Sequence, residues 1–173
     1  LLPKPLPKDG SGPWLNLALK TGDAGVITTI YEQAVTGGFD AKTTLVTLRG
    51  INEAINQRQV KPTGDNGKLL TLINGADQDV KLAAIVLAGS VGAQEARLIE
   101  LAKDASSPTA VRVAATDALA NFKSAESRDA LVALSDAKSP VRSHAVLALA
   151  RNHREVAVPL IAAYASEITE AEQ

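Results

Sequence analysis

Residues 136–149 read DAKSPVRSHAVLAL, and this stretch decides how the rest of the chain is interpreted. It begins with Asp136, continues through a short polar turn containing Pro140, and opens a helix at Val141. Small and aliphatic residues then follow at steps of three and four, which is the spacing of one helical face. The stretch therefore predicts a polar turn followed by a helix with one buried face.

Two further copies of this pattern lie upstream. The sequence Val-Arg-x-x-Ala-x-x-Ala-Leu begins at Val111 as well as at Val141, and a weaker copy begins at Val80, where Lys81 replaces the arginine. The three valines are 31 and 30 residues apart. A fixed spacing of this size is typical of structural repeats, so we expect short helical units stacked on one another.

The composition favours an all-α protein. Hydrophobic residues make up 46% of the 173 residues and aromatic residues only 3%, so alanine, leucine, valine and isoleucine must form the core. Small alanine side chains let helices approach closely, and no segment shows the strict alternation of a strand. Helices are expected at about 14–20, 24–35, 41–59, 67–74, 78–88, 93–103, 108–122, 125–135, 140–152 and 154–166. Gly50 lies inside one of them and predicts close packing or a kink there.

The chain divides into three parts on this interpretation. Residues 1–13 hold four prolines and predict a stiff, extended leader. Residues 14–166 form a single repeat domain, with degenerate units over 14–60 and clearer repeats over 66–166. Residues 167–173 form an acidic tail. Because the chain starts at Leu1 and contains no methionine, we expect it to be a piece of a longer, multidomain product.

Charge and composition limit the classes of partner. A formal net charge of −1 argues against nucleic-acid binding, which relies on a basic field. No apolar run is long enough to insert into a membrane. The chain has no cysteine, which removes disulfides and cysteine zinc sites. This absence fits the cytoplasm and the periplasm equally, and the oligomeric state is left open.

The repeat resembles the HEAT family, and most closely its short bacterial form, which also occurs in phycobilisome-lyase-type proteins. The stretch from Asp136 to Leu149 carries this resemblance throughout. The resemblance implies an α-α superhelix, that is, a solenoid of antiparallel helix pairs with a concave binding face. It further implies a ladder between repeats, in which turn aspartates meet the arginines of the following helices. The candidates for this ladder or for a partner interaction are Asp104, Asp136, Lys81, Arg112, Arg142 and His144, and a ligand-binding role is the alternative for the two arginines.

A narrower resemblance concerns residues 47–55, TLRGINEAI. Together with the repeats that follow, they are similar to the helical segments of planctomycete-type multidomain proteins, between a dehydrogenase-like propeller and a haem-c domain. This resemblance implies a bacterial, extracytoplasmic spacer whose redox chemistry lies in other domains.

Few residues in the chain offer chemistry of their own. The only histidines are His144, expected on the inner side of its helix or at the groove, and His153, expected in a solvated turn. Two histidines do not make a metal site, and the serines lack the surroundings of a catalytic nucleophile. Glu95, Glu100 and Asp117 are expected on exposed helix faces. Trp14 is expected to plug the open end of the array, or else to dock onto a neighbouring domain. We therefore predict no catalytic, cofactor or metal residues.

These observations favour a non-enzymatic interaction module or scaffold. Its partner would be a protein or another domain of the same polypeptide, which contacts a concave surface of the repeats. The alternative is an enzyme on a HEAT-like scaffold, of the bilin-lyase or DNA-glycosylase kind. DNA repair would need a basic groove with aromatic residues, and the sequence is short of arginine, lysine and aromatic residues.

Overall fold

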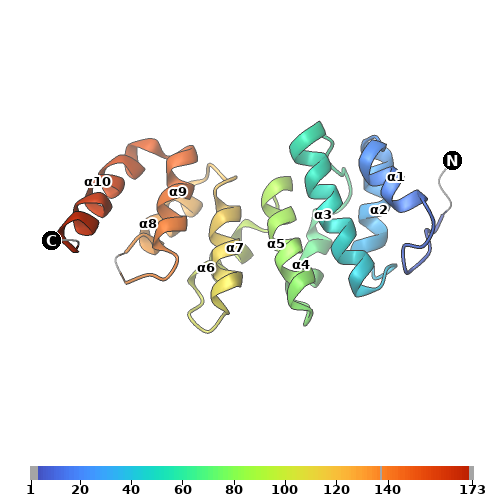
Figure 1. The fold of residues 1–173 in the computed structure, drawn as a ribbon, viewed down its shortest axis with the longest axis horizontal. Coiled ribbons are helices and arrows are strands. Elements are labelled where there is room, and N and C mark those ends of the chain that lie inside the picture. Colours follow the sequence, from blue (N-terminus) through green and yellow to red (C-terminus); the bar gives the residue numbers. More distant parts are fainter. Residues whose placement is uncertain (1–3, 137, 172–173) are drawn as a thin grey trace. The chain divides into compact units, whose positions relative to one another are not determined.

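A computed structural model describes residues 4–136 and 138–171, with side chains described as far as residue 166. Within these ranges the chain is all α-helical and contains no strand, which confirms the predicted fold class (Figure 1). The elements are α1 (Trp14–Thr21), α2 (Ala24–Val35), α3 (Ala41–Arg58), a 3-10 turn η1 (Asn66–Lys68), α4 (Leu69–Ile73), α5 (Gln78–Val91), α6 (Glu95–Lys103), α7 (Thr109–Leu119), α8 (Ala125–Leu134), α9 (Arg142–Asn152) and α10 (Arg154–Ala171). None of the described helices is both long and apolar enough to span a bilayer.

Side chains at the helix starts explain several of these boundaries. Asp23 accepts a hydrogen bond from the Val26 backbone N–H at 2.9 Å, and Asp40 accepts one from Thr43 at 2.7 Å. Each bond satisfies one of the free backbone donors of a first helical turn. Ser124 caps α8 in the same manner through the N–H of Ser127. Asp23, Asp40 and Ser124 are therefore the N-caps of α2, α3 and α8.

The repeat signature marks buried positions. Val80, Val111 and Val141 are buried, as are the alanines four residues after each of them. The residues seven and eight positions after each valine are buried too: Leu87, Ala88, Ala118, Leu119, Ala148 and Leu149. One face of α5, α7 and α9 is thus formed by equivalent residues in all three copies. The helical periodicity of the sequence predicts this face correctly.

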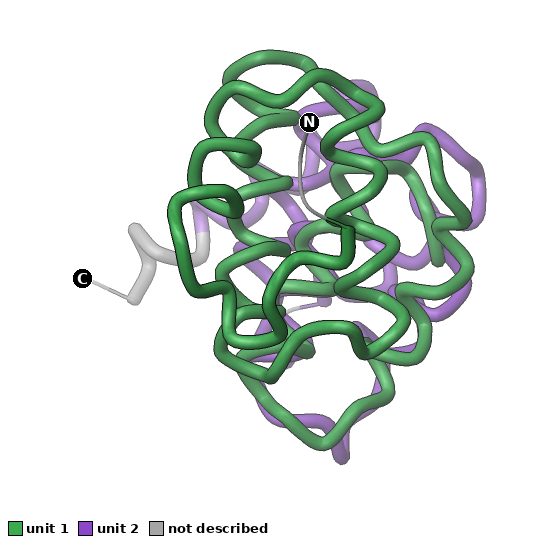
Figure 2. Tube along the Cα trace, turned by 90° about the vertical axis from the view of Figure 1, so that its right-hand side faces the viewer, with its two compact units in different colours: residues 1–94 green, residues 95–173 purple. Residues whose placement is uncertain are grey.

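The chain separates into two compact units, residues 1–94 and residues 95–173 (Figure 2). In unit 1, α3 packs against α1, α2 and α5, while α4 packs against α5 and α2. In unit 2, α7 packs against α6, α8 and α9, while α10 packs against α9. We expected one repeat domain over 14–166, and the division falls between α5 and α6, within the clearer repeats. Repeat proteins consist of local contacts, so such a division is compatible with a repeating sequence.

Gly50 brings α1 and α3 close together. A methyl group added at Gly50 would lie 2.7 Å from Leu19 Cδ1, which is closer than carbon atoms pack. Leu19 itself is buried. The close packing predicted at Gly50 is therefore confirmed.

Two terminal segments differ from the expectation. Residues 4–13 lie against unit 1: Leu6 is 5% exposed, and its backbone N–H and carbonyl both bond to the Gln33 side chain. Asp40 N–H also donates to the Lys8 carbonyl at 2.9 Å. The leader is therefore docked on the rest of unit 1, a contact that the sequence did not predict. At the other end, α10 continues to Ala171, so residues 167–171 are helical where we expected an acidic tail; 172–173 lie outside the described residues.

The irregular segment between α3 and α4 is held by side chains of unit 1. The Tyr31 hydroxyl donates to the Asp65 carbonyl at 3.2 Å, and Thr28 accepts from Thr63 N–H at 2.9 Å. Tyr31 is fully buried, and its burial raises its pKa to about 12, with smaller contributions from Asp65 and Glu32. The segment is a fixed inter-helix connection.

Candidate interaction surface

The turn aspartates of the signature organise their own turns. Asp104 accepts hydrogen bonds from the hydroxyls of Ser106 and Ser107 at 2.6 and 2.7 Å, and from Ser106 N–H at 2.9 Å. These bonds lower the pKa of Asp104 to about 2, and the charge of Arg112 contributes least. Asp136 accepts from Lys138 N–H at 2.9 Å. All of these bonds stay within the turns, and the ladder between repeats stays a prediction.

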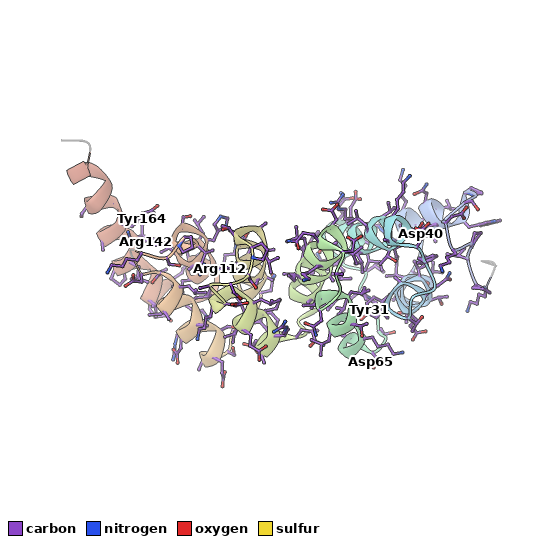
Figure 3. All side chains as sticks on the ribbon, turned by 90° about the horizontal axis from the view of Figure 1, so that it is seen from below. Tyr31, Asp40, Asp65, Arg112, Arg142 and Tyr164 are labelled. Carbon is purple, nitrogen blue, oxygen red and sulfur yellow. The ribbon has the colours of Figure 1, made fainter. Side chains whose placement is uncertain are left out.

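The basic residue that follows each signature valine has no uniform role. Arg112 Nε donates to the Ala102 carbonyl at 3.2 Å, near the end of α6, where helix carbonyls lack partners. The Arg142 guanidinium lies 4.4 Å from the centroid of the Tyr164 ring, a cation–π contact between α9 and α10 (Figure 3). Lys81 occupies the equivalent position of α5 and is half-buried. The two arginines thus contribute to packing between helices.

His144 forms a contact that no other copy can form. Its Nδ1 lies 2.8 Å from Asp117 Oδ1, so the pair joins α9 to α7 across 27 residues of sequence. The two side chains are 38% and 53% exposed, which places the pair at the surface. The sequence predicted that His144 lies inward or at a groove and that Asp117 is exposed. It did not predict that they meet, because that requires the register of α7 against α9.

The same surface carries an exposed apolar residue. Leu147 is 63% exposed and follows His144 by three residues, which places it on the same side of α9. The equivalent residues six positions after the signature valine are Val86 in α5 and Asp117 in α7. This position is exposed in all three copies and differs in each. We refer to Asp117, His144 and Leu147 as the α7–α9 face.

Glu95 stabilises unit 2 from a position expected to be solvent-exposed. Its Oε1 accepts from the Ser127 hydroxyl at 2.6 Å and also from the Ser124 hydroxyl. Ser127 is fully buried, so α6 and α8 are joined by a shielded polar contact. The expectation of a solvated Glu95 is wrong. Only the spacing of about one repeat between Glu95 and Ser127 could have indicated this contact.

His153 and Trp14 also differ from their predicted environments. His153 is 8% exposed at the junction of α9 and α10, so it is not a solvated turn residue. Trp14 is 42% exposed at the start of α1, and the buried residues of this helix are Leu15, Ala18 and Leu19. The end of unit 1 is thus covered by the other face of α1. Docking of Trp14 onto a neighbouring domain stays a prediction.

The residues described above are suited to making contacts with a partner surface. Within the part of the chain that the structure describes, no cluster of three or more histidine or acidic side chains is placed to hold a metal ion. The α7–α9 face combines one exposed aliphatic side chain with a histidine–carboxylate pair. Such a combination can bury apolar area and exchange hydrogen bonds with a protein surface.

Comparison with known proteins agrees with the repeat pattern. Residues 67–150 match HEAT repeats. This HEAT-like segment contains all three signature copies and all of the α7–α9 face, and it covers just under half of the chain. HEAT repeats generally act as protein-interaction scaffolds. No curated protein and no solved structure matches the chain.

Proposed function

We propose that this chain is a non-enzymatic interaction module that contacts a protein partner, or another domain of its own polypeptide, through the α7–α9 face. The observation that carries the proposal is Leu147, which is 63% exposed at a position where the repeat signature imposes no residue type. Buried signature residues determine how helices stack, so the exposed residues that differ between copies are free to determine which partner binds. We also propose that the surface presented to the partner is concave, as the resemblance to HEAT repeats implies.

The partner surface is apolar at its centre and polar around it. Leu147 would enter a pocket on the partner, and burying a leucine side chain contributes about 1.5–3 kcal/mol. His144 and Asp117 would lie beside that contact, where they can donate and accept hydrogen bonds at the rim. Rim contacts of this kind add specificity more than affinity.

Titration of a purified partner against surface variants tests this proposal. Leu147→Glu should weaken binding by roughly tenfold or more, because it removes the apolar contact and buries a charge. The matched control is Val158→Glu on α10, since Val158 is 64% exposed and lies outside the α7–α9 face. Equal losses in both variants, or full binding by Leu147→Glu, would contradict the proposal.

The non-enzymatic part needs its own measurements. A gel shift with duplex DNA at low salt and an absorbance titration with a tetrapyrrole address the glycosylase-like and lyase-like alternatives. We expect neither ligand to bind. Turnover that disappears on substitution of particular side chains would overturn this part and leave the interaction surface to be judged separately.

We further propose that the chain is a segment of a larger bacterial protein, on the resemblance of residues 47–55 and the repeats after them to planctomycete-type multidomain proteins. Sequencing of the full-length gene is the test. A C-x-x-C-H haem motif downstream would support this placement, whereas a stop codon immediately after Gln173 would contradict it.

A further inference from the structure

A groove of about 320 Å³ lies between α1 and α3 in unit 1. Gly50 has no side chain, so Leu19 of α1 packs directly against the backbone of α3 beside the groove. Its apolar residues include Leu19, Ala54 and Val46, and Val46 is 42% exposed. The repeat signature does not involve any of these residues. The groove is therefore a feature of unit 1 alone.

Cationic side chains predominate among the charged residues that line this groove. Lys20, Arg49 and Arg58 contribute three positive charges, and Glu53 contributes the one carboxylate. Glu53 already accepts a hydrogen bond from Gln57 at 3.0 Å. Lys20 and Arg49 are exposed, and within the described residues neither has a carboxylate within ion-pair distance. This local excess of positive charge contrasts with the formal net charge of −1 of the chain.

Arg58 is held in place before any ligand arrives. Its Nη1 donates to the Gly22 carbonyl and its Nη2 to the Leu19 carbonyl, both at 2.8 Å. A guanidinium carries five N–H donors, so three remain for a ligand. A side chain that is already fixed loses little conformational entropy on binding. Arg58 is therefore a preorganised anion contact at one wall of the groove.

We propose that the α1–α3 groove binds an acidic peptide segment in which carboxylates stand next to an aliphatic residue. The carboxylates would meet Arg49, Lys20 and the remaining donors of Arg58, and the aliphatic side chain would cover Val46. Charge complementarity identifies the class of ligand, and the apolar residues favour a peptide over a phosphate polymer. This site is built from other helices than the α7–α9 face, so either can fail without deciding the other.

Fluorescence anisotropy with the full 173-residue chain tests the groove. The probe is a fluorescein-labelled peptide of alternating glutamate and leucine, and its counterpart has lysine in place of glutamate. We expect the acidic peptide to bind, the basic one not to bind, and binding to weaken as salt is added. Arg49→Gln and Lys20→Gln should each weaken binding by roughly tenfold, the effect of losing one hydrogen bond to a charged group.

Lys42→Gln is the matched control, because Lys42 is an exposed cation on the same helix but does not line the groove. It should change binding by less than about twofold, within the small effect of an exposed charge. Circular dichroism melting checks that every variant is folded. An equal loss in Lys42→Gln would mean diffuse attraction and overturn the site. Displacement of the peptide by duplex DNA or inorganic phosphate at equal concentration would overturn the assignment to a peptide, as would failure of the acidic peptide to bind.

Discussion

Unit 1 and unit 2 pack helices in similar ways but use different residues to do so. In unit 2, helices α6 to α9 are 9–11 residues long, and polar contacts between α6 and α8 and between α7 and α9 span 27–32 positions. In unit 1, helices α1 to α5 vary from 5 to 18 residues, and the contacts of Tyr31, Arg58 and Ser90 span 34–39 positions. The regular unit relies on alanines, whereas the irregular one relies on a buried tyrosine and a glycine.

This difference shows what the repeat signature is needed for. Equivalent buried alanines in α7 and α9, one repeat apart, keep the packing of these helices similar, so a short sequence period suffices for unit 2. Unit 1 has no such series before α5. It replaces the series with single residues that each fix one contact: Tyr31 under the connection, Gly50 at the α1–α3 crossing and Arg58 at the end of α1. A mutation in unit 1 should therefore have a larger and more local effect.

Tyr31→Ala should have the largest effect of the substitutions considered. Removing a fully buried aromatic ring costs about 3–5 kcal/mol of unfolding free energy. Tyr31→Phe keeps the ring and loses the bond to the Asp65 carbonyl, which costs about 1 kcal/mol. Urea denaturation of both variants measures these values. A loss below about 1 kcal/mol for Tyr31→Ala would mean that unit 1 does not depend on this residue.

Ala145→Leu tests the alanine packing of unit 2. Ala145 is fully buried, and added methylenes in a well-packed site cost about 1–3 kcal/mol. Ser143→Leu on the exposed side of the same helix should stay within about 0.5 kcal/mol. Gly50→Ala is the corresponding substitution in unit 1. Its added methyl group clashes with Leu19, and a gain in helix propensity of about 1 kcal/mol offsets part of the cost of that clash. A lower melting temperature for Ser143→Leu than for Ala145→Leu would contradict the packing argument.

Glu95→Ala should leave the buried Ser127 hydroxyl without its acceptor. An unsatisfied buried polar group costs about 1–3 kcal/mol. The double variant that adds Ser127→Ala should recover part of this loss, because the fully buried hydroxyl is then removed. Recovery should be incomplete, because the half-buried Ser124 hydroxyl also loses its bond to Glu95. In unit 1, Asn52→Ala removes one of two acceptors of the half-buried Ser90 hydroxyl and should cost less, since that hydroxyl keeps its bond to the Val86 carbonyl at 3.2 Å. Thermal unfolding of these variants beside the unchanged chain measures this order.

The His144–Asp117 pair should contribute little to stability. Half-exposed surface pairs of this kind give about 0.2–1 kcal/mol of coupling energy. A double-mutant cycle with alanine at both positions measures this energy, and added salt should reduce it. A coupling energy well above about 1 kcal/mol would mean that the pair is structural, and it would weaken its assignment to the α7–α9 face.

The smallest expected effect concerns the Asp104 turn in acid. The carboxyl group ionises near 3.8 when unperturbed, and its folded-state pKa is lowered to about 2 by its serine partners. Its stabilising contribution is therefore present above about pH 4 and is lost as the pH falls towards about 2. Asp104→Asn should remove that part of the acid dependence, while leaving the part due to Asp40, whose pKa is lowered by Thr43. Identical acid titrations of unfolding for Asp104→Asn and the unchanged chain would contradict this assignment.

The sequence by itself determined the helices and the buried face of each signature copy. Helical periodicity, capping aspartates and the valine spacing are local properties, so α2 was predicted residue for residue and Ala84, Ala115 and Ala145 were correctly placed in the core. Gly50 was also interpreted correctly, because a glycine destabilises the interior of a helix unless a close contact or a kink requires it. The HEAT-like character of residues 67–150 follows from the same local pattern.

Only the tertiary structure decided which polar residues meet. The contacts of Asp117 with His144, of Glu95 with Ser127 and of Arg58 with the end of α1 depend on the register between helices, which a single sequence does not specify. The docked leader is a similar case, because proline indicates extended backbone but not the surface on which that backbone lies. Local spacing determines which face of a helix is apolar, whereas packing between helices decides which side chains become neighbours.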